Sequence, residues 1–251
     1  MKKLWIFVLT LTTVLTFANI SQARSDGPET GGGGGVVFVG PSHTAPRFVD
    51  MYNLTERQQL DLRQRYAGQN NSQQRLRVKE STADLLNYDP AFRQADSLLN
   101  QWFDNLATRT LNVNITEMLM GPIQWTFTHT LQRYENHYRP THLPRGKNIH
   151  TVAHYLKKES PVVKIVLSVW NQMPLVDQTA LVLHESLRHY QLGMGQSIDD
   201  ELLQKATVLA LYCSPSAEHK GDLYNLLGTA SQLNRTQKKA LFSRAISDCT
   251  N

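Results

Sequence analysis

The spacing of apolar residues predicts a chain that mixes short strands with longer helices. Residues 36–39 form a short apolar run, and residues 47–54 are a second candidate strand. Over residues 123–129 apolar and polar side chains alternate, which is typical of a half-buried strand. Residues 161–169 are almost continuously apolar and β-branched, which indicates a buried strand. Residues 148–155 are a further candidate strand.

Helical spacing of apolar residues extends over much of the remaining chain. Residues 55–69 are charged and rich in amides, and they are predicted to form a helix. Residues 82–108 carry apolar side chains at helical intervals, with Pro90 starting or kinking the helix. Further helices are expected near the C-terminus, at residues 198–213, 218–227 and 237–248.

The helix predicted for Leu175–Gly193 has an unusual polar face. Asp177 is its expected N-cap, and Gly193 is its expected end. The core face is expected to comprise Val176, Ala180, Leu183, Leu187 and Tyr190. The opposite face, within about a third of the circumference, comprises Asp177, Leu181, His184, Glu185 and Arg188. Such a face is either a solvated surface or the floor of a cleft.

Together these patterns predict an α+β fold. A small mixed sheet, built from the N-terminal and middle strands, would pack against the long helices, and the C-terminal half would be helical. The strand at residues 161–169 leads into the helix that carries His184 and Glu185. We expect residues 36–251 to form one domain.

The beginning of the chain has the features of a secretory signal peptide. Lys2 and Lys3 precede a short apolar run, and Ser21-Gln22-Ala23 offers small residues for cleavage after Ala23. Residues 24–35 end in a run of glycines and are expected to be a flexible leader. No later stretch is long and apolar enough to be a transmembrane segment. The mature protein is therefore expected to be exported, to the periplasm or beyond it.

The net charge of the chain limits the classes of binding partner that are expected. The 251-residue chain has a formal net charge of +5, and removal of Lys2 and Lys3 leaves +3. No cluster of Lys and Arg is interleaved with aromatic residues, so nucleic acid is not an expected partner. A mild positive charge is consistent with weak attraction to an anionic envelope surface.

Cys213 and Cys249 are the only cysteines. An oxidising compartment would permit a disulfide between them, and the alternative is two buried thiols. The disulfide would close a loop of about 36 residues, which contributes roughly 3–4 kcal/mol in the chain-entropy model. We expect the two cysteines to pair.

His184 and Glu185 begin a sequence that approaches the zinc motif H-E-x-x-H, in which two histidines bind zinc and the glutamate is the general base. Here Arg188 stands four residues after His184, and arginine has no lone pair for a metal. His189 lies about 140° from His184 on a regular helix, so sharing one ion would require a π-bulge. Glu185 and His189 are an alternative ligand pair. An ion pair between Glu185 and Arg188 is the purely structural alternative.

Histidines elsewhere offer weaker candidates for metal binding. His150 and His154 would face the same side of the strand at residues 148–155, as a second candidate ligand pair. His129 is expected to be a partly exposed residue of the strand at residues 123–129 rather than a ligand.

The order of short segments resembles a group of uncharacterised exported proteins of predatory Gram-negative bacteria. The segments that carry the resemblance are the glycine run, Val36-Val37-Phe38, Val49-Asp50-Met51-Tyr52, Trp170 and Leu183-His184-Glu185-x-x-Arg188. The strand followed by a His-Glu helix is also similar to the core of zincin metallopeptidases. That resemblance implies that His184 is a metal ligand and Glu185 the base, with Arg188 in place of the second ligand.

The acids after this helix fit the same resemblance. Asp199, Asp200 and Glu201 lie near the place where zincins can carry a third, glutamate-type ligand. They are equally explained as acids in the first turn of the next helix, where they complement its dipole.

Two functions remain open from these observations. In the first, the protein is a zinc-dependent, peptidase-like hydrolase of peptide or cell-wall material, with His184 and Glu185 as its catalytic residues and His189 as the other candidate ligand. In the second, which Arg188 favours, it is a non-catalytic envelope or periplasmic protein that binds a ligand beside Glu185 and Arg188. We expect Glu185 to be held by Arg188 or another cation and to face a cleft. Leu181 and Val182 on its flank are apolar, and we expect residues 161–169 or the loop at residues 134–146 to cover them.

Overall fold

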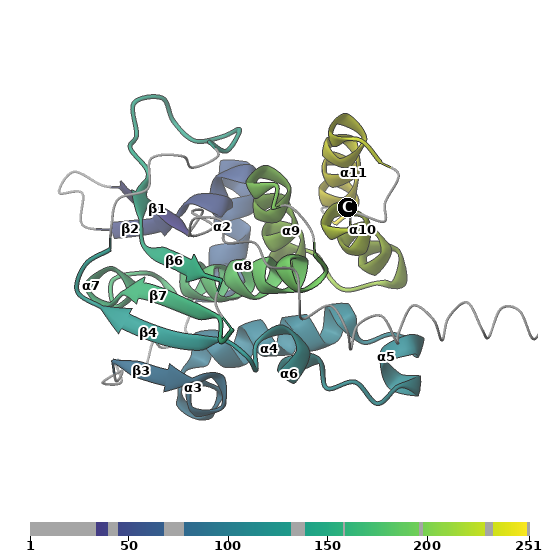
Figure 1. Cartoon of the computed structure of the whole chain (residues 1–251). Helices are drawn as coiled ribbons and strands as arrows, with labels where there is room; N and C mark the ends of the chain where they lie inside the picture. Colours follow the sequence, from purple (N-terminus) through teal and green to yellow (C-terminus); the bar gives the residue numbers. More distant parts are fainter. Residues whose placement is uncertain are drawn as a thin grey trace, which may run out of the picture.

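The computed structural model describes residues 34–39, 45–67, 78–131, 139–157, 159–195, 198–228 and 233–249. The expected signal peptide, and the leader as far as residue 33, lie outside this range. The last two residues of the expected flexible leader are instead part of the fold, because Gly34 bonds to Glu185 and Gly35 pairs with Thr151. Within it the chain has the predicted α+β arrangement, because small sheets are packed by helices and everything after Pro174 that belongs to an element is helical. Figure 1 shows the strands gathered on one side and the last two helices on the other.

The strands form two sheets, where the sequence predicts one. The first sheet has the order β2-β1-β5 with antiparallel neighbours, and its strands are β1 (Gly35–Val39), β2 (Ala45–Phe48) and β5 (His150–Thr151). The second sheet has the order β3-β4-β7-β6, and its strands are β3 (Lys79–Ser81), β4 (Gln124–Thr128), β6 (Ala153–Leu156) and β7 (Val162–Val166). In it β4 and β7 are parallel, and the other neighbours are antiparallel.

One face of the second sheet belongs to the core. Trp125 and Phe127 of β4 are buried, and Gln124 beside them is exposed, as the alternating pattern predicts. The ring of Phe92 packs edge-on against Trp125 with 4.7 Å between ring centroids. Because Phe92 lies in the helix Pro90–Phe103, this helix covers the apolar face of the sheet.

The helices of the first two thirds of the chain are mostly short. They are α2 (Glu56–Arg65), α3 (Thr82–Tyr88), α4 (Pro90–Phe103), α5 (Leu106–Thr110), α6 (Ile115–Leu119) and α7 (Leu167–Trp170). Thr55 and Gln58 form a capping box at the start of α2. Pro90 occupies the first turn of α4, where a missing N–H costs nothing, so it separates two helices rather than kinking one.

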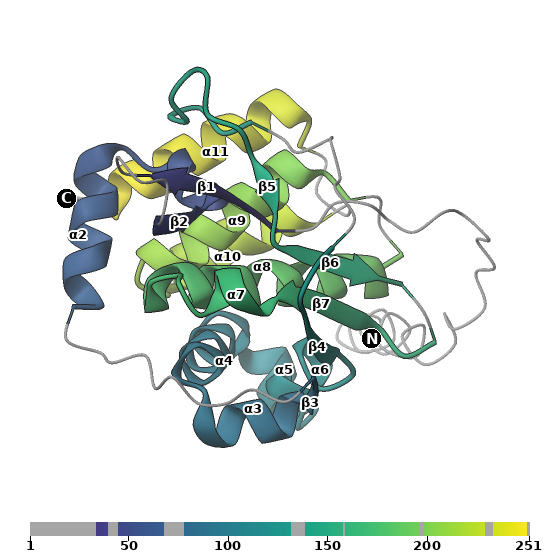
Figure 2. The ribbon, with the colours of Figure 1, turned by 90° about the vertical axis from the view of Figure 1, so that its left-hand side faces the viewer.

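Helix α8 (Leu175–Gly193) has the predicted bounds and lies at the centre of the molecule. Figures 1 and 2 show it between α4 and α9 (Asp200–Tyr212), and it also contacts α6, β2 and the 3₁₀ helix η2 (Val49–Asn53). The helices α10 (Ala217–Leu227) and α11 (Arg235–Asp248) pack against α9.

Three of the predicted strands are wrong in part. The strand predicted at 161–169 ends at Val166, and residues 167–169 belong to α7. Residues 49–53 of the strand predicted at 47–54 form η2 instead. All five of these residues are buried, whereas a strand with one exposed face would bury only every second residue. The strand predicted at 148–155 is split between the two sheets. The N–H groups of Val152 and Ala153 both donate to the carbonyl of Gly34, at 2.9 and 3.1 Å, so the alternation is broken between β5 and β6.

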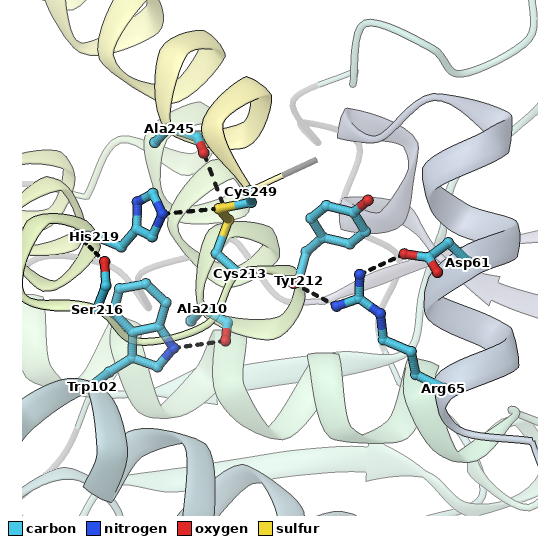
Figure 3. Close-up of a disulfide and its surroundings, with 10 residues drawn as sticks. All are labelled: Asp61, Arg65, Trp102, Ala210, Tyr212, Cys213, Ser216, His219, Ala245 and Cys249. Atoms are coloured by element: carbon cyan, nitrogen blue, oxygen red, sulfur yellow. Dashed lines mark hydrogen bonds and ion pairs between the residues drawn. A yellow bond between two sulfur atoms is a disulfide. The ribbon is translucent and has the colours of Figure 1, made fainter. Parts of the chain in front are cut away.

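Cys213 and Cys249 form the expected disulfide, with 5.4 Å between their Cα atoms. Figure 3 shows it beside the last turn of α9, whose carbonyl groups accept hydrogen bonds from other elements. Trp102 Nε1 donates to the carbonyl of Ala210 at 2.8 Å, and Arg65 donates to that of Tyr212 at 2.9 Å. The end of α9 is therefore joined to α4, α2 and the C-terminal helix.

No helix in the described parts of the chain is both long and apolar enough to span a membrane.

Candidate functional site

The polar side chains of α8 are buried. Glu185 is 0 % exposed, and His184 and Arg188 are each 2 % exposed. This overturns the interpretation of the face as a solvated surface, and it also removes Glu185 from any open cleft. Elements on several sides of α8 cover it, and Asp177 is buried in the same way. Charges at this depth need partners, because desolvation of an unpaired ion costs several kcal/mol.

His184 is held between an acid and a guanidinium. Its Nδ1 lies 2.6 Å from Asp50 Oδ2 in η2, and its Nε2 lies 3.1 Å from the Nη2 of Arg188. Burial lowers the pKa of His184, but the Asp50 carboxylate outweighs burial, so the pKa lies above its ordinary value. The contact with Arg188 fits the neutral ring with its proton on Nδ1, since a protonated Nε2 would face an N–H donor.

Arg188 reaches three partners from its position on α8. Besides His184 it contacts Asp200, at the start of α9, with 3.0 Å between Nη2 and Oδ1. Its Nε lies 3.6 Å from Glu185 Oε2, so the predicted ion pair between Glu185 and Arg188 is present. The other carboxylate oxygen of Glu185 accepts a hydrogen bond from the backbone N–H of Gly34 at 3.0 Å. Glu185 thus links the beginning of the described chain to the middle of α8.

Asp177 lies in the first turn of α8 and is not its N-cap, which is Pro174. Its carboxylate accepts the N–H of Phe48 at 2.8 Å and lies 3.0 Å from the Nη2 of Arg47, both in β2. Burial raises the pKa of Asp177, although Arg47 and the Phe48 N–H favour the charged form. Asp177 therefore attaches the first sheet (β2-β1-β5), the N-terminal sheet, to α8.

His189 lies apart from this network, as its angle on the helix predicts. Its Nδ1 is 2.7 Å from the hydroxyl of Tyr155 in β6. Burial lowers the pKa of His189. No hydrogen bond between His184 and His189 is described, and each ring has its own polar partner.

The other candidate ligands are also dispersed. Asp199 caps α9, and Glu201 is paired with Lys205 at 3.1 Å and with Lys239 at 3.0 Å. His150 in β5 is exposed and His154 in β6 is buried; the two lie in different sheets and do not form the predicted pair. His129 follows β4 and is exposed.

The donor set around His184 does not fit a zinc ion. Its Nε2, which would bind the metal, faces the Arg188 guanidinium, and a guanidinium cannot be a ligand. Within the ranges described above, no group of three or more His, Cys, Asp or Glu side chains is arranged to hold a metal ion. The arrangement is instead a network of buried charges that holds α8, η2, α9 and Gly34 together.

Sequence patterns did not identify the partners of this network. Asp50, Arg47 and Gly34 lie 130 to 151 residues away along the chain from the α8 residues that they contact. The one local signal is Asp50 itself, an acid between Val49 and Met51 in an otherwise apolar run. Gly34 also packs on Leu181, whose cover was expected from residues 161–169 or 134–146.

Comparison of the chain with models of protein families, with curated proteins and with solved structures finds no match.

Proposed function

We propose that the chain is an exported, non-catalytic binding protein of the cell envelope. The His-Glu-x-x-Arg segment of α8 has a structural role in this proposal, and the ligand binds elsewhere on the surface. The proposal keeps the second of the two functions expected from the sequence, but it moves the binding site away from Glu185 and Arg188, because both side chains are buried.

The observation that carries the proposal is the position of the Arg188 side chain. Its guanidinium lies against His184 Nε2 and Glu185, which are the two groups that a zincin-like hydrolase would need for metal binding and for activation of water. A dication next to this guanidinium would be repelled. Arg188 also bridges to Asp200 at 3.0 Å, so withdrawal of its side chain would break a second ion pair.

Export is supported by the disulfide between Cys213 and Cys249, because disulfides persist mainly in oxidising compartments. It is also supported by the signal-peptide features of residues 1–23. Sequencing of the exported protein is expected to begin near Arg24, and an exported chain that still carries Met1 would contradict this part of the proposal.

A metal analysis of the purified protein tests the non-catalytic part. We expect the parent to carry no stoichiometric zinc, a chelator to leave its unfolding midpoint unchanged, and no hydrolysis of a peptide substrate after zinc is added. The matched variants are His184→Ala and His129→Ala, which remove a buried and an exposed histidine. Stoichiometric zinc that is lost only in His184→Ala, together with peptide hydrolysis, would establish the hydrolase instead.

The binding part is tested by co-sedimentation with isolated envelope components. Peptidoglycan sacculi and anionic lipid vesicles are the two probes. Saturable retention on one of them supports the proposal, and the absence of retention on both contradicts it.

A further inference from the structure

A cavity of about 480 Å³ lies between β1 and the loop that precedes β5. Its walls are formed by Val37 and Phe38 of β1, and by Arg145, Gly146, Lys147, Asn148 and His150. Pockets of a few hundred Å³ suit a small ligand. The cavity shares no residue with the buried network of α8.

The cavity exists because β1 and β5 separate. They are paired over only two positions, Gly35 with Thr151 and Val36 with His150. Before His150 the chain leaves the sheet, and Figure 2 shows this loop projecting past the end of β5. Phe38 therefore lies along one side of an opening whose other side is the loop.

The loop is held in place, so the cavity does not depend on a mobile wall. Leu143 is buried in a small apolar cluster with Val37 and Val49. The guanidinium of Arg139 donates to the carbonyl groups of Pro144 and Lys147 and so closes the turn between them. Gly146 within that turn has a φ of +78°, a conformation that glycine adopts without strain.

The charged side chains that line the cavity are cationic. Arg145 is exposed and Lys147 is half-buried, and neither has a carboxylate partner among the residues that the structure describes. The sequence from residue 139 to residue 157 contains no Asp or Glu. The buried cations of α8 and β2 behave differently, because Arg188 and Arg47 are each paired with acids.

An aromatic wall lies beside these cations. The ring of Phe38 is half-buried and meets the ring of His150 edge-on, with 5.3 Å between their centroids. It offers an apolar surface to a ligand whose anionic group is held by the loop. A cavity with a cationic side and an aromatic side suits a ligand that has an anionic end and a less polar body.

We propose that this cavity binds the phosphate group of a small phosphate ester. Arg145 and Lys147 hold the phosphate, since the guanidinium fork matches its oxygens and the ammonium adds a point charge. The organic part of the ester lies against Phe38. The inference goes beyond the proposed function, because it uses no residue of α8 and would hold whether or not α8 binds a metal.

Calorimetric titration of the purified exported protein with glucose 1-phosphate, at low salt, tests the proposal. Inorganic phosphate and glucose are titrated separately. We expect saturable binding of glucose 1-phosphate, weaker binding of inorganic phosphate, and none of glucose. The double variant Arg145→Ala/Lys147→Ala should weaken binding by about tenfold or more. Binding to phosphatidylglycerol vesicles is measured separately, and it shows whether the phosphate ester is a lipid headgroup.

The matched control is Arg57→Ala/Lys157→Ala, which removes the same charge from two exposed positions outside the cavity. If this control weakens binding as much as the cavity variant, the effect is one of net charge and the proposal is wrong. It is also wrong if the parent binds neither glucose 1-phosphate nor the vesicles, or if the cavity variant binds them as the parent does. Binding of vesicles alone, lost in the cavity variant, would identify a lipid headgroup as the source of the phosphate.

Discussion

Three of the buried polar side chains of α8 are each matched by a group from a distant part of the chain. Asp177 is matched by Arg47, Glu185 by the N–H of Gly34, and His184 by Asp50. A buried pair of this kind contributes little net stability, because desolvation offsets the attraction. Loss of one partner is costly nevertheless, since it leaves the other charge buried without compensation.

Glu185→Ala is therefore expected to lower the free energy of unfolding by about 3 kcal/mol or more. The substitution removes one of the two acids that pair with the buried Arg188 among the described residues, and it leaves the Gly34 N–H without its acceptor. Chemical denaturation of parent and variant, each with and without chelator, measures the change.

The control for this substitution is Glu117→Ala, at an exposed position, for which a change below about 1 kcal/mol is expected. Equal, near-zero changes in both variants would mean that the α8 network does not contribute to stability. A chelator effect on the parent would instead support a bound metal.

His189 gives the molecule a stability that depends on pH. Burial lowers its pKa from the ordinary value of 6.5, so below that pH the unfolded chain binds a proton that the folded chain does not. Acidification from about pH 7 to about pH 5 should therefore destabilise the parent relative to His189→Phe. Urea midpoints of both proteins over this range measure the difference, in which the other titrating groups cancel. Identical pH profiles would show that His189 is not responsible.

At the scale of elements, apolar spacing predicts the structure well wherever an element is determined by its own residues. The bounds of α8 agree with the prediction, and the helix of residues 55–69 is found as α2 behind its capping box at Thr55. Apolar spacing does not predict an element correctly where contacts with distant parts of the chain determine its bounds. One carbonyl, that of Gly34, accepts two successive N–H groups and splits the predicted strand 148–155 into β5 and β6.

The candidate site was predictable only in part, for the same reason. The pairing of Glu185 with Arg188 follows from their spacing on a helix, and the structure contains it. The burial of that face does not follow, because amphipathicity cannot indicate that β2 and η2 cover the polar side of α8 as well. The role of Asp50 depends on a contact across 134 residues.

At Gly34 the backbone passes close to the side chains of Phe48 in β2 and Leu181 in α8. A Cβ atom there would lie 2.9 Å from Phe48 Cε2 and 3.3 Å from Leu181 Cδ1, and Phe48 itself is fully buried against His184. Gly34→Ala is expected to destabilise the protein by about 1–3 kcal/mol, as overpacking does. Thermal or urea denaturation measures the change.

Gly193→Ala is the matched control at the end of α8, where a Cβ would meet no atom within 4 Å. There the same substitution should stabilise the protein by up to about 1 kcal/mol, because alanine has a higher helix propensity than glycine. Destabilisation of equal size at both positions would contradict the close approach of Gly34.

At the scale of the whole molecule, the disulfide fastens the last helix to the rest of the protein. It joins the ends of α9 and α11 over a separation of 36 residues. Cys213→Ala/Cys249→Ala should lower the free energy of unfolding by roughly 3–4 kcal/mol, the loop-closure value for this length. A reducing agent should shift the urea midpoint of the parent and leave that of the double variant unchanged. Two titratable thiols in the native protein would contradict the prediction.

The attachment of Gly34 to Glu185 also bears on the order in which the chain folds. These residues are 151 apart, and the bonds from β2 and η2 to α8 span 129 and 134 residues. Contacts between residues so far apart in the sequence form late, because closing the long loop between them costs conformational entropy. The N-terminal sheet cannot complete its attachment until α8 has been synthesised. Until that point the bonds of Gly34, Phe48 and Asp50 to α8 have no partner, so a nascent chain that ends before residue 177 lacks all three of them.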